Sequence, residues 1–359
     1  MMATETMQAV VCHAPFDYRV EEVAKPEPGP GEVLVKVGAA GICASDIKCY
    51  TGGSLFWGQH GEGGYCEAPV IPGHEFAGMV AALGEGAAEL HNVSLGDAVI
   101  AEQIIPCGQC RFCKTGHYWM CHKHDIFGFK RQRAEGAMAE YMIYPTKSRI
   151  HQIDLRIPMQ EAAYIEPLAC AIHAVDRGDI KPGDTVVLAG VGNIGLCALQ
   201  AAKAFNPGQL IALDTKNERL ELAKRLGADV GINVLEEDAA ARVKAMTDDY
   251  GCDVYIEMSG SAKAPQQGLD MIRRLGTLVA FSVCNEPATI DWNMVGDQKE
   301  LNIHGSHLGP YSYPRAIAAI ADGSIDVKSL ISASYPLAEF AAALDAAKGG
   351  DNLKTLLIP

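Results

Sequence analysis

The stretch TVVLAGVGNIG, residues 185 to 195, decides the fold class of this chain. Its apolar first half predicts a short buried strand, and NIGLCALQAAKAF after it predicts a helix. Between them, Gly190, Gly192 and Gly195 have G-x-G-x-x-G spacing. Gly190 would permit a tight turn, Gly192 would let the backbone approach a pyrophosphate, and Gly195 would allow close helix packing. A strand, a glycine-rich turn and a helix in this order predict a dinucleotide-binding unit.

The residues around this turn extend the cofactor prediction. Asp214 ends the next predicted strand, QLIALD, where a carboxylate would accept hydrogen bonds from both hydroxyls of an adenosine ribose. The same charge would repel a 2′-phosphate, so we expect NAD rather than NADP. The helix start would offer N–H groups to the phosphates, and Asn193, Ile194 and Arg219 complete the expected cofactor-binding set. NADP, or a glycine-rich turn in some other α/β protein, remains an alternative.

Strands alternate with helices beyond this turn, which predicts an α/β fold with a doubly wound parallel sheet. The expected elements are the helix NERLELAKRLGA closed by Gly227, a helix around 236 to 247, the strand DVYIEMSG, the helix APQQGLDMIRRLG and the strand TLVAFSV. Before about residue 160 the chain reads as strands separated by Gly and Pro. PMQEAAYIEPLACAIHAVDRG predicts a helix broken at Pro167, and the tail from about 310 to 359 predicts one helix with short strands.

Composition and charge describe a globular protein and exclude several partners. The chain has 359 residues, 48% of them hydrophobic and 21% charged, which suits two domains. Its formal charge of −14 disfavours nucleic acid and anionic membrane, because both repel a net acid. The N-terminus lacks the basic start and apolar run of a signal peptide. We therefore expect a cytoplasmic protein whose twelve cysteines stay reduced, where clustered thiols usually bind metal.

Four thiols cluster in PCGQCRFCKTGHYWMC, residues 106 to 121. Their C-x2-C-x2-C-x7-C spacing suits a chain that curls around one tetrahedral ion, so Cys107, Cys110, Cys113 and Cys121 predict a structural zinc site. Such a site is closed, because no position is left for a substrate. An iron–sulfur cluster, disulfides or thiols without a ligand remain alternatives.

A second, open metal site is predicted from three separate stretches. GICASD (41 to 46), PGHEFAG (72 to 78) and IEPLA (165 to 169) offer one thiolate, one imidazole and two carboxylates, from Cys43, His74, Glu75 and Glu166. Catalytic zinc needs about three protein ligands and one position for water or substrate. Taken singly, each residue has a plainer explanation, as a buried thiol, a surface pair beside a turn or a charge at a helix start.

Taken together, these stretches resemble the zinc-dependent medium-chain alcohol dehydrogenases. The resemblance runs from about residue 8 to the C-terminus and includes EPLACAIHAV and VVLAGVGNIGLCALQAAK in the family's order. It implies a GroES-like β-barrel catalytic domain, residues 1–167 and 308–359, with the structural zinc lobe at about 106–122. It also implies a Rossmann NAD-binding domain at 168–307, two Zn²⁺ ions per subunit, and assembly into a homotetramer or homodimer.

The glutamates resemble the polyol branch of the family, which includes sorbitol dehydrogenase. The resemblance implies that Cys43, His74 and Glu75 hold the catalytic zinc and that Glu166 bonds to the water or substrate on it. It leaves open an exchange of Glu75 and Glu166 as ligands during turnover. Asp46 matches the family's acid that accepts the far N–H of His74, which would fix the ring tautomer.

The resemblance also implies a mechanism. The substrate hydroxyl would ionise at zinc, and its carbon would then deliver hydride to the nicotinamide. Ser45 would bond the substrate oxygen and pass its proton outward. Lys48 stands where many relatives have a histidine at the end of this proton relay. Lys48 therefore either ends the relay or forms only a surface salt bridge.

The substrate prediction rests on two departures from sorbitol dehydrogenase. The glycine-rich loop 52–69 is longer and carries Phe56, Trp57, His60 and Tyr65, and HGSHLGPYSYP lacks the Arg-Tyr pair that binds distal sugar hydroxyls. His307 is the expected polar replacement, or else a surface histidine. We expect a four-carbon polyol, such as erythritol or threitol, oxidised to a ketose. Activity like that of L-threonine 3-dehydrogenase or another zinc alcohol dehydrogenase, or a non-catalytic NAD-binding protein, are the alternatives.

Overall fold

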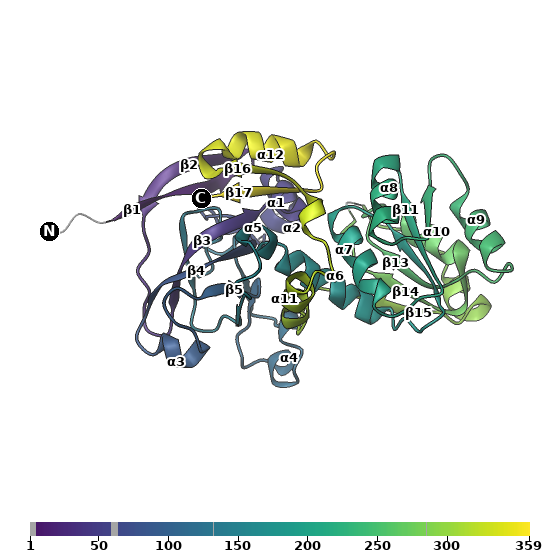
Figure 1. Ribbon diagram of the computed structural model, residues 1–359, viewed down its shortest axis with the longest axis horizontal. Coiled ribbons are helices and arrows are strands. Elements are labelled where there is room, and N and C mark those ends of the chain that lie inside the picture. The colour runs from purple at the N-terminus through teal and green to yellow at the C-terminus, as the bar shows by residue number, and fades with distance from the viewer. Residues whose placement is uncertain (1–4, 59–63, 132, 285) are drawn as a thin grey trace. The chain divides into compact units, whose positions relative to one another are not determined.

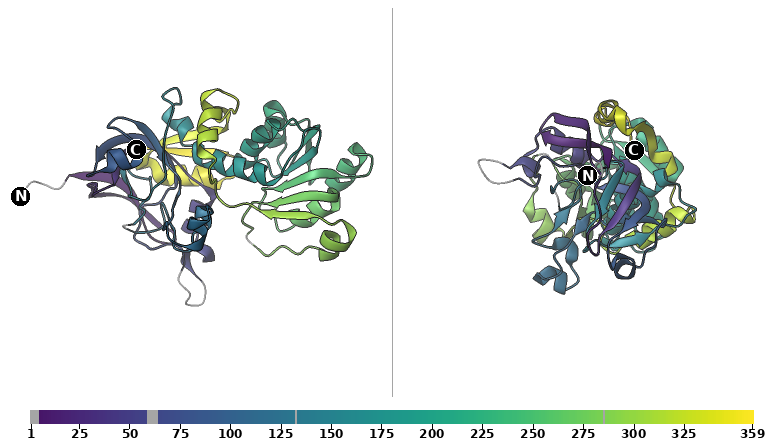
Figure 2. Two further views of the ribbon diagram at one scale, coloured as in Figure 1. Left: turned by 90° about the horizontal axis from the view of Figure 1, so that it is seen from below. Right: turned by 90° about the vertical axis from the view of Figure 1, so that its left-hand side faces the viewer.

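The computed structural model describes residues 5–58, 64–131, 133–284 and 286–359 of the chain. The chain forms two compact units (Figure 1). Unit 1 contains Met1–Glu166, Tyr313–Asp322 and Val327–Pro359, and unit 2 contains Pro167–Ser312 and Gly323–Asp326. The yellow C-terminal strands therefore lie in the same unit as the purple and blue elements, as Figure 2 also shows.

Unit 1 is built on antiparallel strands. β1 (Thr6–Ala14) pairs with β2 (Asp17–Ala24), and a seven-stranded sheet has the order β16-β17-β3-β4-β5-β9, with β8 also paired to β3. The C-terminal strand β17 joins this sheet beside β3, where Leu356 lies opposite Gly41. The strands of unit 1 beyond β1 and β2 are β3 (Val33–Gly41), β4 (Glu75–Leu83), β5 (Ala98–Ala101), β6 (Ile104–Ile105), β7 (Asp125–Ile126), β8 (Tyr141–Tyr144), β9 (Ile150–Gln152), β16 (Ile331–Pro336) and β17 (Lys354–Ile358).

Short helices connect and cover these strands. In α12, Phe340, Ala343 and Leu344 form a buried face that packs with Ile42 and Leu357, because residues three and four apart share one side of a helix. The tail therefore holds two α-helices, α11 and α12, where the sequence predicted one helix. The helices of unit 1 are α1 (Ala44–Tyr50), α2 (Ser54–Trp57), α3 (Ala87–His91), α4 (Arg111–Lys114), η1 (Tyr118–Met120), α5 (Met159–Ala162), α11 (Tyr313–Ala321), η3 (Lys328–Leu330), η4 (Leu337–Glu339) and α12 (Phe340–Lys348).

Unit 2 is a six-stranded parallel sheet of order β12-β11-β10-β13-β14-β15. This is the strand order of the doubly wound dinucleotide-binding fold, so the predicted α/β fold class is confirmed. Its elements are α6 (Ile165–Arg177, shared with the end of unit 1), β10 (Thr185–Ala189), α7 (Asn193–Lys203), β11 (Gln209–Asp214), α8 (Asn217–Leu226), β12 (Val230–Asn233), α9 (Ala239–Met246), β13 (Cys252–Glu257), α10 (Ala264–Met271), β14 (Ile272–Ala280), η2 (Met294–Gln298) and β15 (Asn302–Gly305).

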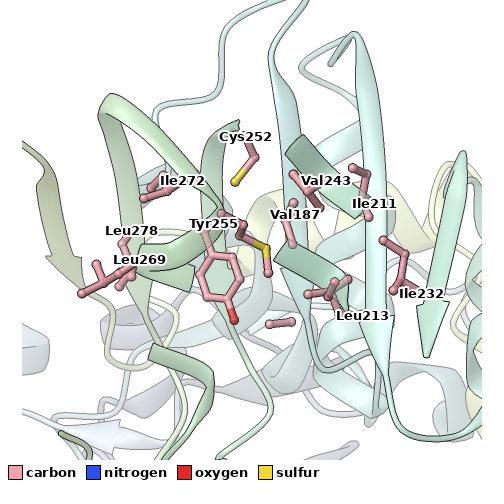
Figure 3. Packing of buried hydrophobic residues seen from close by; sticks show 13 residues of the cluster. Val187, Ile211, Leu213, Ile232, Val243, Cys252, Tyr255, Leu269, Ile272 and Leu278 are labelled. Atoms are coloured by element: carbon pink, nitrogen blue, oxygen red, sulfur yellow. The ribbon is translucent and has the colours of Figure 1, made fainter. Parts of the chain in front are cut away.

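One hydrophobic cluster of unit 2 lies between one face of this sheet and the helices α9 and α10. Val187, Ile211 and Ile232 come from three neighbouring strands, and they pack in one cluster with Val243 of α9 and Leu269 of α10 (Figure 3). All five side chains are buried. Strands that are covered on both faces read as continuous apolar runs, which is why TVVLAG and QLIALD were recognisable in the sequence.

Three further local predictions were wrong. The break in the helix around Pro167 falls earlier, between Ala162 and Ile165, because Pro167 occupies the first turn of α6, where its missing N–H costs no hydrogen bond. The residues after Met271 form β14 rather than helix, since the buried Ile272 pairs with Cys252 of β13. The glycine-rich loop contains a helix, α2.

The part of the chain that the structure describes contains no helix long and apolar enough to cross a membrane.

Candidate active site

Cys43, Ser45 and Asp46 are held together by the first turn of α1. β3 ends at Gly41, and Cys43 immediately precedes the helix. The backbone N–H of Cys43 donates a hydrogen bond to Asp46 Oδ2 at 2.8 Å, so the carboxylate caps the helix start. Lys48 lies one turn further along the same helix and is half-buried.

His74 and Glu75 reach the same place from β4. Glu75 is the first residue of β4 and pairs with Gly41 of β3, so the two strands bring it beside Cys43. A Cβ atom at Gly41 would collide with the Glu75 carboxylate, which explains a glycine at this position. One ligand atom each from Cys43, His74 and Glu75 lies within 4.8 Å of the other two. Both His74 and Glu75 are buried.

This donor set fits a zinc ion. A thiolate, an imidazole and a carboxylate are the three protein ligand types that zinc accepts, and three ligands leave one position for substrate. His74 Nδ1 and Asp46 Oδ1 are buried and face each other at 3.5 Å, without completing a hydrogen bond to any described residue. With Nδ1 directed at Asp46, Nε2 is the nitrogen left for a metal.

The groups around His74 favour a positive charge there, which a bound metal ion would also supply. Burial lowers the pKa of His74, but the Asp46 carboxylate and the Cys43 thiol raise it by more than burial lowers it. The pKa of His74 therefore lies well above its ordinary value. Ser45 Oγ lies 3.3 Å from His74 Nε2, on the side of the ring opposite Asp46. Ser45 is thereby placed beside the ring nitrogen that a metal would use.

Glu166 is buried at the start of α6 but is not one of the three mutually close ligands. Its Oε1 accepts a hydrogen bond from Gln103 Nε2 at 2.5 Å. The structure thus brings Glu75, rather than Glu166, together with Cys43 and His74. Gln103 was not found by sequence reasoning, because it belongs to none of the quoted motifs.

A second residue that the sequence analysis missed is Lys354. Its Nζ forms a buried ion pair with Glu75 Oε2 and lies 3.4 Å from the carbonyl oxygen of Ile42. Burial lowers the pKa of Lys354, but the charges of Glu75 and Cys43 outweigh this and raise it above its ordinary value. The one available signal was a lysine that opens the otherwise apolar strand KTLLI.

The four thiols of the cysteine lobe, residues 106–122, also meet. The Sγ atoms of Cys110 and Cys113 are 3.5 Å apart, those of Cys110 and Cys121 3.8 Å, and those of Cys107 and Cys113 4.0 Å. A tetrahedral zinc ion about 2.3 Å from each sulfur would hold them roughly 3.8 Å apart. These spacings fit zinc and are too long for disulfide bonds.

Backbone N–H groups point at these sulfurs, as they do at thiolates. The amides of Gln109 and Cys110 each donate to Cys107 Sγ at 3.4 Å, and the amide of Lys123 donates to Cys121 Sγ at 3.4 Å. The pKa of Cys110 is lowered to about 6, chiefly by the backbone N–H of Cys113. The pKa of Cys107 is also lowered, whereas burial raises the pKa values of Cys113 and Cys121. The lowered pKa values of Cys107 and Cys110 favour the charged form that binds metal.

The glycine-rich turn of unit 2 fits a dinucleotide. Gly190 has φ +92°, and a Cβ there would lie 2.6 Å from Ser259 Cα. A side chain at Gly195 would collide with the carbonyl of Gly190. At Gly192 the nearest atom to an added Cβ is Arg219 Nη1 at 3.7 Å, so the backbone is open to a phosphate. Asn193 and Ile194 form the first residues of α7.

Asp214 lies at the carboxyl end of β11 and is buried. Its Oδ2 accepts a hydrogen bond from the N–H of Val191 at 3.0 Å, and its Oδ1 accepts from Thr215 at 2.8 Å and Lys216 at 3.0 Å. Arg219 Nη1 is 3.8 Å from Oδ2. Asp214 thus fastens the glycine-rich turn to the next loop, a structural task that the sequence did not indicate.

Aromatic residues of the 52–69 loop pack one layer away from His74. Phe129 lies 5.6 Å from the His74 ring, and Phe56 and Tyr65 pack on Phe129 at 5.2 and 5.9 Å between ring centroids. Trp57 instead donates its indole N–H to the carbonyl of Cys49. His60 lies outside the described residues, and His307 is exposed in unit 2.

Comparison with known proteins gives two matching family models. Residues 29–154 match the alcohol dehydrogenase GroES-like domain, and residues 193–322 match the zinc-binding dehydrogenase domain. The chain is 49% identical to an erythritol/L-threitol dehydrogenase of Mycolicibacterium smegmatis, over 99% of this chain and 98% of that one. It is 34% identical to a sorbitol dehydrogenase of Bacillus subtilis, with the same coverage. A crystal structure of a zinc-binding dehydrogenase from Sinorhizobium meliloti bound to NADP superimposes with a TM-score of 0.88, at 30% identity over 99% and 100% of the two chains.

Proposed function

The chain belongs to the zinc-binding alcohol dehydrogenases, and from this premise we propose that it oxidises a secondary alcohol of a small polyol to the ketose with NAD⁺. The observation that carries the proposal is the donor set of half-buried Cys43 and buried His74 and Glu75, in a chain with 49% identity to an erythritol/L-threitol dehydrogenase. A tetritol such as erythritol or threitol is accordingly the proposed substrate.

Each residue of the site has a proposed task. Cys43, His74 and Glu75 would hold the catalytic zinc, which supplies a Lewis acid that polarises the alcohol. Ser45 would bond the substrate hydroxyl and pass its proton outward, with Lys48 at the far end of the relay. Asp46 would hold the tautomer of His74, and Glu166 would bond to the substrate or water in the site.

The two domains have different proposed roles, in line with the two family models. Residues 1–167 and 308–359 would form the catalytic domain, and residues 168–307 would bind NAD through the glycine-rich turn and Asp214. These bounds match units 1 and 2 except at Pro167, 308–312 and 323–326, which lie in unit 2. The cysteine lobe would hold a second, structural zinc. We further propose a cytoplasmic homotetramer or homodimer, supported by the position of β15 at the edge of the parallel sheet, because an edge strand is able to pair with a second copy.

A panel of sugar alcohols with NAD⁺, followed by the absorbance of NADH, tests this function. Erythritol or threitol should give the highest kcat/KM, and metal analysis should find two zinc ions per chain. Removal of the open-site metal should stop turnover before the protein unfolds. Turnover of L-threonine but of no polyol would overturn the proposed substrate class.

A further inference from the structure

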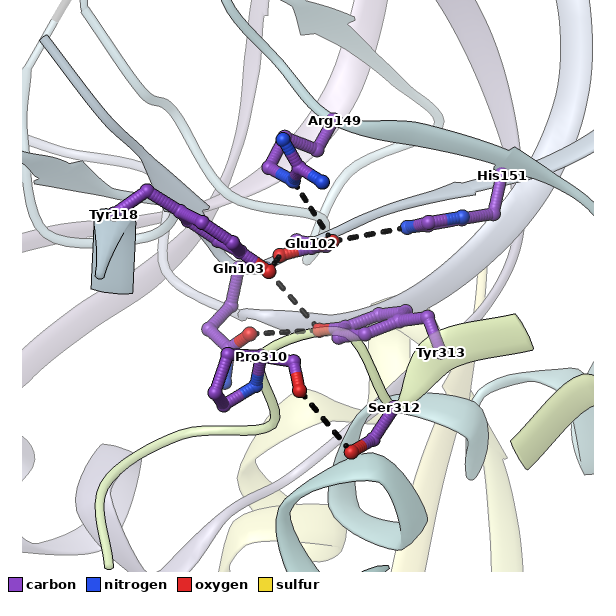
Figure 4. A network of polar contacts seen from close by, with 8 residues as sticks. All are labelled: Glu102, Gln103, Tyr118, Arg149, His151, Pro310, Ser312 and Tyr313. Carbon is purple, nitrogen blue, oxygen red and sulfur yellow. Dashed lines mark hydrogen bonds and ion pairs between the residues drawn. The ribbon is translucent and has the colours of Figure 1, made fainter. Parts of the chain in front are cut away.

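The dipeptide Glu102–Gln103, between β5 and β6, connects two parts of unit 1 (Figure 4). Both residues are buried, at 1% and 2% exposure. We propose that Gln103 is a positioning residue that holds the carboxylate of Glu166 in one orientation, and that Glu102 anchors Gln103 to the cysteine lobe. The inference rests on the proposed function, in which Glu166 bonds to the substrate or water.

The orientation of the Gln103 amide is set by Tyr313. The hydroxyl oxygen of Tyr313 accepts a hydrogen bond from the backbone N–H of Gln103 at 3.2 Å, and the hydroxyl donates its one proton to Gln103 Oε1 at 2.7 Å. The amide oxygen therefore faces Tyr313. The NH₂ group of Gln103 must then face Glu166, and Nε2 donates a hydrogen bond to Glu166 Oε1. A flipped amide would set two oxygens against each other at Glu166, so only one orientation is satisfied.

The other half of the dipeptide is held as firmly. Glu102 accepts hydrogen bonds from the Tyr118 hydroxyl at 2.6 Å, Arg149 Nε at 3.0 Å and His151 Nε2 at 3.1 Å. Tyr118 belongs to the cysteine lobe, between Cys113 and Cys121. The His151 ring also stacks on Tyr313, with 5.3 Å between ring centroids. The backbone that carries Gln103 is thus fixed by the lobe, by the sheet and by α11.

A buried carboxylate with a fixed donor keeps one rotamer, because a rotated oxygen would lose its hydrogen bond in a medium without water. Catalytic groups lose activity when their supporting residues let them move by about 1 Å, by as much as about 100-fold. Replacement of Gln103 by a side chain of similar length without a donor should therefore lower kcat. It should leave the KM for NAD nearly unchanged, since the dinucleotide residues lie in unit 2.

The test compares Q103M, E166Q and the double variant with the best substrate of the alcohol panel. We expect Q103M to lower kcat at least 10-fold relative to wild type, with two zinc ions still bound. In the E166Q background, the same exchange should lower kcat less than 2-fold relative to E166Q alone. Q160M, the same exchange at an exposed position of α5, is the matched control and should behave as wild type. An unchanged kcat in Q103M, or losses that multiply independently in the double variant, would overturn the proposal.

The coupling between Gln103 and Glu166 can also be measured without turnover, from the thermal stability of the same variants. The midpoint of thermal unfolding should fall in Q103M and in E166Q by amounts that do not add in the double variant, because both exchanges weaken one hydrogen bond. If the wild-type chain oxidises no alcohol, the proposed function fails, and the additivity of the Tm shifts still decides whether Gln103 holds Glu166. Additive shifts would reject the contact.

Discussion

At the scale of single residues, Cys43 is the most sensitive test of the metal site. Replacement of Cys43 by Ser exchanges a soft thiolate for a hydroxyl that stays protonated at neutral pH, so zinc should be lost from this site alone. We expect at least a 1,000-fold loss of kcat and one zinc per chain instead of two, with unchanged NAD binding. C284S is the control, because Cys284 belongs to neither thiol-containing donor group. Full activity in C43S would remove the metal mechanism.

Lys354 supports a different prediction, about stability. Its side chain and that of Glu75 are only 3% and 1% exposed, so in the zinc-free protein a change of Lys354 to Met leaves a buried carboxylate without its cation. Breaking such a pair costs about 3–5 kcal/mol, which urea unfolding would measure. The double variant E75Q/K354M should regain much of this loss. If K354M is as stable as wild type, the ion pair is not formed in solution.

Asp214 connects cofactor choice with local structure. D214A should raise the KM for NAD at least 10-fold while kcat changes much less, since the ribose contact is made in the ground state and in the transition state alike. It should also lower Tm, because three backbone N–H groups lose their acceptor. Initial rates with NAD and NADP provide the measurement, and an unaltered KM for NAD would reject the ribose role.

At the scale of elements, the cysteine lobe depends on its metal. The lobe contains two regular elements, α4 and η1, and Tyr118 is the one buried residue within them. The segment therefore has little core of its own. C110S should therefore expose residues 106–122 to protease and lower Tm, whereas C284S should do neither. Limited proteolysis followed by mass spectrometry locates the cleavage. Resistance of C110S equal to wild type would show that the lobe holds its shape without four ligands.

Elements with strong local signals were predictable from the sequence. TVVLAG and QLIALD are buried strands, and Gly227 ends α8 with φ +117°, as its position after a periodic helix predicted. The helix prediction for IRRLG was wrong, because its arginines fit either the surface of a helix or a partly exposed strand. There the ladder to β13 decided the structure, and a ladder partner twenty residues away leaves no local pattern.

At the scale of the whole molecule, sequence motifs identified the candidate metal donors but not the residues that support them. Cys43, His74 and the four thiols sit in short motifs whose residue types reveal the chemistry. Lys354 lies 279 residues from Glu75, and Tyr313 lies 210 residues from Gln103. Hydrophobic periodicity carries no information on partners so far apart. The supporting roles of Lys354 and Tyr313 can be recognised only once the structure shows that β17 and α11 belong to unit 1.

The distance of β17 from β3 along the chain has a consequence for synthesis in the cell. A ribosome that adds about 5–20 residues per second needs roughly 16–63 s to translate the stretch between Gly41 of β3 and its partner Leu356 of β17. During that time nascent β3 lacks its neighbour β17, whereas the strands β10 to β15 leave the exit tunnel as one uninterrupted block. The parallel sheet is therefore free to fold co-translationally, while the first-made half of the polypeptide waits for its final strands and is the half most in need of a chaperone.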